Sequence, residues 1–155
     1  MITALLIVHS LLAVALLGAV THQALSLAKR SRGTREKSFL DEFSGVNPAV
    51  YVKPVILLFV VTCIGGGFLY PQYRIDVRPS LEERQMSAAN GVFEIKEHLA
   101  AIGLGILPAY LMCWRRPLLP EHAAARRSLT WILAFVTWWS FLVGHVLNNI
   151  KGLLP

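Results

Sequence analysis

Long uncharged stretches of the chain alternate with short segments that hold all of its Asp, Glu, Lys and Arg residues. The uncharged stretches cover residues 2–28, 54–73, 99–114 and 128–150. A helix needs roughly 20 apolar residues to cross the hydrocarbon core of a bilayer, and three of the stretches reach that length. The third has 16 residues, so its helix is expected to begin within the charged segment before it. The pattern predicts four membrane-spanning helices.

We therefore predict an all-α integral membrane protein, a four-helix bundle that forms a single domain over residues 1–155. The spans are expected at about residues 2–28, 50–71, 90–114 and 128–150. A soluble bundle would need polar faces that repeat every 3.6 residues, and the four stretches lack them. Asn47 and Pro48 are expected to cap and start the second helix. The short connections favour an up-down-up-down order of the helices.

The distribution of charge predicts the orientation of the bundle. Basic residues gather in the first and third connections, whereas the second connection, from about residue 72 to 89, mixes both signs. Cytoplasmic connections carry the excess of Lys and Arg, so both termini are expected on the outer, periplasmic side of a bacterial inner membrane. The net charge of +6 follows from this topological signal. Because no basic stripe lies on a folded surface, the charge does not indicate binding to nucleic acid.

Several classes of catalytic chemistry lack their residues in this sequence. There is no glycine-rich nucleotide loop and no arrangement of Ser, His and Asp typical of nucleophilic catalysis. The two cysteines form no CxxC motif and lie at different expected depths, so a disulfide or thiolate metal site is not indicated. Any catalytic role would therefore come from a bound cofactor.

The histidines are the most informative residues. At a rise of about 1.5 Å per residue, His9, His98 and His145 lie roughly 25–30 Å from the predicted cytoplasmic boundary, on three different helices. A b-type haem takes axial nitrogens from both sides of its plane, and helical bundles build such sites from facing side chains. We therefore expect one haem b, with two of these histidines on the iron and the third on a propionate or a quinone. His22 lies lower, where a second haem is possible but the nearby Gln23 and Ser26 are poor iron ligands.

The surroundings of the three histidines add candidate contacts. Trp131, Trp138, His145 and Asn149 fall along one stripe of the fourth helix, beside which a porphyrin would fit. Two basic residues near the outer mouth, Arg74 and Lys96, are expected to pair with haem propionates. Glu94 lies one turn before His98, where it would orient that ring or relay protons. The alternative interpretation is that Glu94, Lys96 and Glu97 are only the water-exposed first turns of the third helix, where the helix dipole favours the two Glu side chains.

The four-span layout, His9 in the first helix and the segment "FEIKEHLAAIGL", with Lys96 near its start, resemble a group of small haem-binding bacterial membrane proteins. This group includes the haem-containing protoporphyrinogen oxidase and copper-resistance D-like proteins. The resemblance implies a haem b site that uses His9. The outer segment "YPQYRIDVRPSLEERQ" and His145 depart from the pattern, so the resemblance extends to the cofactor and not to the enzyme reaction.

Three functions remain open from the sequence. The first is electron transfer near the outer face, as a redox subunit of an oxidoreductase complex that draws on quinol or another membrane donor. Its expected partners are the bilayer and other membrane or periplasmic redox subunits. The second is a cofactor-free accessory subunit that docks through small-residue faces. The third is metal-ion handling, in which His9, His98 and His145 bind copper or zinc with the help of Glu94.

Overall fold

Long apolar runs with few helix breakers fold here into four long helices. The computed structural model describes residues 2–28, 45–115 and 118–153, and every regular element within these ranges is helical. The elements are α1 (Ile2–Ala28), η1 (Pro48–Tyr51), α3 (Val52–Gln72), η2 (Tyr73–Val77), α4 (Arg78–Glu83), α5 (Ser87–Cys113), η3 (Pro120–His122) and α6 (Ala123–Leu153).

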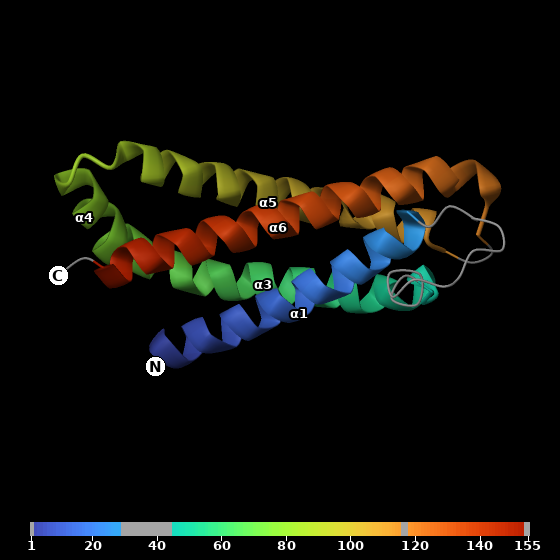
Figure 1. The fold of residues 1–155 in the computed structure, drawn as a ribbon, viewed down its shortest axis with the longest axis horizontal. Coiled ribbons are helices and arrows are strands. Elements are labelled where there is room, and N and C mark those ends of the chain that lie inside the picture. The colour runs from blue at the N-terminus through green and yellow to red at the C-terminus, as the bar shows by residue number, and fades with distance from the viewer. Residues whose placement is uncertain (1, 29–44, 116–117, 154–155) are drawn as a thin grey trace, which may run out of the picture.

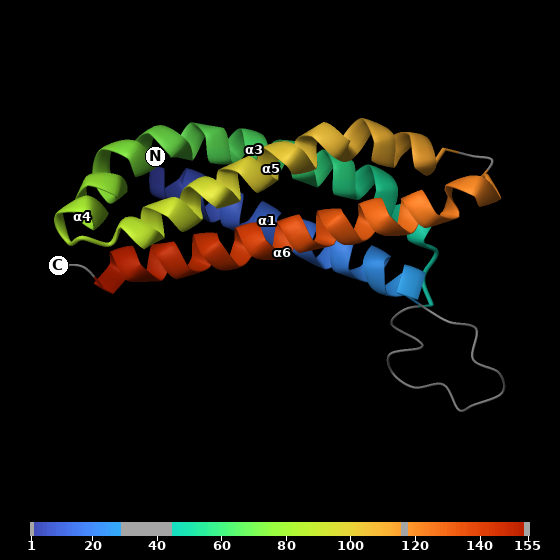
Figure 2. The same cartoon turned by 90° about the horizontal axis from the view of Figure 1, so that it is seen from above.

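The four long helices, α1, α3, α5 and α6, run alternately up and down (Figures 1 and 2). The start of α1 and the end of α6 lie at the same end of the bundle as α4; we call this the termini end, and the opposite end the loop end. In space α1 packs along both α3 and α6, and α5 packs mainly along α6. The contact between α3 and α5 closes the ring of helices and is less extensive.

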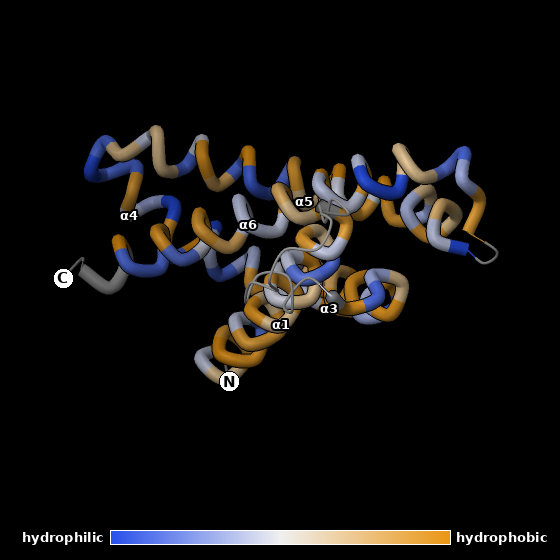
Figure 3. The backbone as a smooth tube through the Cα atoms, turned by 45° about the vertical axis from the view of Figure 1, so that its right-hand side comes forward, coloured by the Kyte–Doolittle hydropathy of each residue, from blue (hydrophilic) through white to orange (hydrophobic). Residues whose placement is uncertain are grey.

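All four helical segments are long and apolar enough to cross a membrane. They are Ile2–Leu27, Pro48–Glu83, Ser87–Cys113 and Pro120–Ile150. Apolar residues dominate α1 along its length, whereas hydrophilic residues gather at α4 and the first turns of α5 (Figure 3). Many large apolar side chains point away from the bundle, for example Leu57, Phe68 and Phe135, which are 65%, 71% and 59% exposed. This arrangement is that of a multi-pass membrane protein whose outer surface contacts lipid.

The second helix begins as expected and ends later than expected. Asn47 caps η1 by accepting a hydrogen bond from the amide of Ala49, and Pro48 is its first residue, which confirms the predicted start. At the other end the expected outer loop is largely helical: a π-helical turn, η2, follows Pro71, and α4 continues to Glu83. The polar composition of the segment after residue 71 predicted an earlier end of the helix.

A small second core explains why α4 folds. Leu81 is fully buried and packs with Val143 and Leu147 of α6. The Arg78 guanidinium also pairs with Glu82 one turn later, at 2.7 Å. The apolar contact of Leu81 and the ion pair beside it stabilise a helix whose composition alone is typical of a loop.

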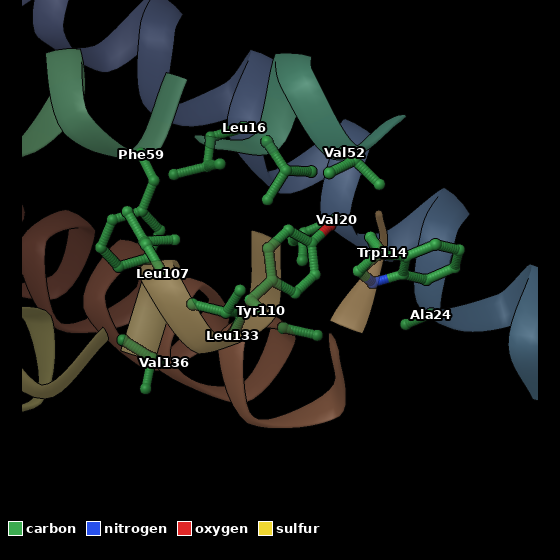
Figure 4. Packing of buried hydrophobic residues seen from close by; sticks show 12 residues of the cluster. Leu16, Val20, Ala24, Val52, Phe59, Leu107, Tyr110, Trp114, Leu133 and Val136 are labelled. Carbon is green, nitrogen blue, oxygen red and sulfur yellow. The ribbon is translucent and has the colours of Figure 1, made fainter. Parts of the chain in front are cut away.

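The main core fills the loop-end half of the bundle (Figure 4). Tyr110 is completely buried, and its hydroxyl donates a 2.6 Å hydrogen bond to the Oε1 atom of Gln23. The Nε2 atom of Gln23 in turn donates to the carbonyl oxygen of Pro48 at 3.0 Å. This chain of hydrogen bonds joins α5 and α1 to η1, which leads into α3, within the main core of the bundle.

Phe59 and Gly103 form a tight contact between α3 and α5. Both residues are buried, and the Phe59 ring lies so close to Gly103 that a Cβ atom there would overlap it. Glycine is therefore required at this position by packing. The contact marks the boundary between the packed loop-end half and the termini-end half of the bundle.

We predict that Gly103→Ala destabilises the protein. The added methyl group would collide with a Phe59 ring that is held by its neighbours, and overpacking of this kind costs about 1–3 kcal/mol. The matched control is Gly105→Ala, because a Cβ atom at Gly105 meets no heavy atom within 4 Å. Thermal unfolding in detergent should show a lower midpoint for Gly103→Ala only. Equal unfolding midpoints for the two variants would contradict the conclusion that packing against Phe59 requires glycine at position 103.

Candidate functional site

A cavity of about 670 Å³ lies among the four long helices, on the termini-end side of Phe59. We call it the central cavity. Its walls are mainly apolar, with Leu16, Phe59 and Leu104 among the lining residues. Each long helix also contributes a polar group: His9 from α1, Thr62 from α3, Lys96 from α5 and His145 from α6. A volume of this size and a mostly apolar lining are typical of small-molecule and cofactor sites.

His9 projects from α1 onto a glycine surface of α3. A Cβ atom at Gly65 would lie 3.1 Å from the Nδ1 atom of His9, and one at Gly66 would lie 3.5 Å from its Cε1 atom. The ring lies near the main chain of Thr62, but its buried Nδ1 atom makes no hydrogen bond of acceptable geometry with the described residues. Nε2, the other ring nitrogen, lies farther from both glycines.

His145 reaches the same cavity from α6. Its side chain is exposed and stacks on Phe141, with ring centroids 6.2 Å apart and planes within 3° of parallel. The turn of α6 that carries it packs beside the first turns of α5, since Val143 and Leu147 cluster with Phe93. His9 and His145 thus face one space from two helices.

An ion pair lies on the α5 wall of the cavity. The Lys96 ammonium is 2.7 Å from the Glu97 carboxylate, and its side chain is only 18% exposed. The same ammonium stands over the Phe93 ring, 4.3 Å from its centroid. Both charges act electrostatically on His9 and Cys63. A cation held in this way is available to an anionic group of a ligand while its own charge is balanced.

Three hydroxyl groups in the cavity wall have buried oxygens without a hydrogen-bond partner among the described residues. They belong to Thr62 of α3 and to Thr137 and Ser140 of α6. A helical hydroxyl ordinarily bonds the carbonyl one turn earlier, as Thr130 does with Arg126 at 2.8 Å. Thr137 is only 5% exposed. Unpaired hydroxyls at such depth indicate a space that a polar ligand or water completes.

A second, more open hollow of about 460 Å³ lies against η2, α4 and α5; we call it the side pocket. It contains Glu94 and His98, and Arg78 joins them from α4. Arg78 approaches Glu94 at 3.4 Å, and the Nδ1 atom of His98 lies 2.7 Å from the carbonyl oxygen of Glu94. His98 is exposed, and it does not line the central cavity.

The candidate residues therefore separate into three groups. His9, His145 and Lys96 line the central cavity, His98 and Glu94 line the side pocket, and Arg74 is exposed and lines neither. No three His, Cys, Asp or Glu side chains in the described part of the chain are grouped closely enough to hold a metal ion.

The tryptophan stripe of α6 also lies elsewhere. Trp131 and Trp138 are 44% and 43% exposed, and neither lines the central cavity. The Nε1 atom of Trp138 donates a 3.0 Å hydrogen bond to Thr21 of α1. This contact ties α6 to α1, so Trp138 has a structural role, and of the stripe only His145 borders the cavity where a porphyrin was expected.

Sequence reasoning missed Glu97 and the three cavity hydroxyls as site residues. Glu97 belongs to the charged segment before the third uncharged stretch, and it was read only as a wetted turn. The expected depth of Glu97 in the membrane, and its position around the helix relative to His9, could have identified it as a site residue. For the hydroxyls the sequence holds no signal, because only the three-dimensional packing shows that they lack their usual carbonyl partner.

No protein-family model matches this chain, and no curated protein or solved structure matches it either.

We predict opposite effects of the same substitution at two threonines of α6. In ligand-free protein, Thr137→Val should raise the free energy of unfolding by about 1 kcal/mol, because it removes a buried hydroxyl that has no partner. Thr130→Val should lower it by about 1 kcal/mol, because that hydroxyl is bonded. Chemical denaturation in detergent measures both. A loss of stability at Thr137 as large as that at Thr130 would contradict the unpaired state of the Thr137 hydroxyl.

Proposed function

We propose that this chain is a membrane haem protein that holds one haem b in the central cavity and transfers electrons through it. The observation that carries the proposal is that His9 and His145 line one apolar cavity from two different helices. A haem b site requires both apolar walls around the macrocycle and imidazole nitrogens that can bind the iron. When bound, the haem supplies one-electron redox chemistry.

The residues of the cavity fit such a group in three respects. His9 rests on Gly65 and Gly66, which orients its ring without a bulky neighbour. Its Nε2 atom is then the nitrogen available to iron. Lys96 would donate a hydrogen bond to a propionate, whereas Arg74, which was expected to share this role, does not line the cavity. The hydroxyls of Thr62 and Thr137 would donate to polar edges of the ligand.

The alternative functions have weaker support. Copper or zinc handling by His9, His98 and His145 would require the three rings at one point, whereas His98 lines a different pocket from the other two. A cofactor-free accessory subunit would not need an apolar cavity lined by unpaired buried polar atoms. The proposal includes two partners in electron transfer. The donor would be a quinol or another membrane component, and the acceptor would be a redox subunit on the outer side.

The proposed setting is a bacterial inner membrane, with the termini end on the periplasmic side. Its support is the concentration of Lys and Arg in the two connections of the loop end. The central cavity and its histidines would then lie in the outer half of the membrane.

We predict that haem content separates four of the five histidine positions. His9→Ala and His145→Ala should each lower the haem bound per chain at least about tenfold, because loss of a metal-site contact typically costs that much or more. His98→Ala should retain haem, since that ring lies in the side pocket. Pyridine haemochrome analysis of purified variants measures the content.

His122→Ala is the matched control, because His122 lies in η3 at the loop end, away from the cavity. A wild-type protein that binds haem and keeps it in both His9→Ala and His145→Ala would contradict the proposed site. Haem loss in the His98 variant alone would move the site to the side pocket.

A further inference from the structure

The central cavity and the side pocket share part of their walls. Six residues line both spaces, and they all lie where α3 and η2 face α5. They are Gly67, Tyr70, Tyr73, Phe93, Glu97 and Ala101. We call this shared wall the seam. It is the place where a molecule in the side pocket comes nearest to the cavity.

Side-chain contacts close the seam at two levels. Towards the termini end, the Tyr73 and Phe93 rings stack with their centroids 3.6 Å apart, and the Tyr73 hydroxyl donates to Asn90 at 2.9 Å. Towards the loop end, the Phe59 ring presses on Gly103. Aromatic packing therefore blocks passage above and below a short central stretch.

The central stretch of the seam is formed by small residues and one charged residue. A Cβ atom at Gly67 would meet no heavy atom within 4 Å, and Ala101 across from it is exposed. Glu97 is the only acidic residue that lines the central cavity and the side pocket alike. Its carboxylate forms an ion pair with the Lys96 ammonium, at 2.7 Å, on the cavity side. We call Gly67, Glu97 and Ala101 the window.

We infer that the window is a water-accessible entrance to the central cavity from the side pocket, and that the balanced Lys96–Glu97 pair keeps this entrance open to solutes of either charge. The pair combines a cation with an anion, so it favours neither sign strongly. Small polar solutes and protons would reach the cavity by this route, whereas the apolar outer faces of the helices exclude them from the lipid side. The inference concerns access to the proposed haem site, but it does not require that the ligand is haem.

Cys63 provides a native reporter, because its side chain lines the central cavity and not the side pocket. In a Cys113→Ser background in lipid nanodiscs, Cys63 is labelled with a small cationic and a small anionic methanethiosulfonate of similar size. Haem content is measured in each sample, and variants are compared at equal content. The ratio of the two rate constants cancels any change in the reactivity of the thiol itself.

Two results are expected. Glu97→Gln should favour the anionic reagent and Lys96→Gln the cationic reagent, so that the ratio differs by about tenfold or more between the two variants. Gly67→Leu should slow both reagents, because its side chain fills the window. Gly105→Leu is the matched control, since Gly105 also has open space at its Cβ position but lines neither space.

Labelling of Cys63 at the wild-type rate in Gly67→Leu would overturn the window as the entrance. An unchanged ratio in both charge variants would overturn the role of the ion pair. Failure of Cys63 to react in any folded variant, while denatured protein reacts fully, would overturn water access altogether. None of these results depends on haem binding, so a haem-free protein that shows the expected ratios would reject the proposed function and retain this inference.

Discussion

The hydrogen-bond chain from Tyr110 through Gln23 to Pro48 holds three helices together at one level, and the rest of the bundle follows from it. Tyr110 and Gln23 are fully buried, so an unpaired hydroxyl or amide there would carry the full cost of desolvation. In a membrane the helices gain nothing from mutual burial of apolar surface alone, because lipid is equally apolar. Polar contacts and close packing therefore decide where the helices meet.

From that level the two halves of the bundle differ in construction. The loop-end half is a dense core closed by Phe59 against Gly103, and Trp138 ties α6 to α1 through Thr21. The termini-end half contains the central cavity, with His9 and the Lys96–Glu97 pair in its walls. A densely packed half thus supports the half that contains the cavity. Ionisable groups inside a membrane protein are functional candidates by default.

Much of the architecture could be predicted from charge and apolar length alone, because a bilayer imposes a helix length that a sequence must meet. Asn47 at the start of the second helix followed from capping chemistry in the same way. The helix of α4 could not be predicted, because it depends on Leu81 finding Val143 and Leu147, which are distant in sequence. The site divides similarly: helical rise brought His9 and His145 to a common region, but it could not show that His98 faces another pocket. Glu97 and Thr137 acquire their meaning only from the cavity.

The central claim is that the cavity holds haem b, and a reduced-minus-oxidised absorbance spectrum of the protein, purified with its native partners, tests it most directly. The account predicts a sharp b-type α band, with pyridine haemochrome analysis giving about one haem per chain. A flat spectrum from protein shown to be folded would contradict the claim.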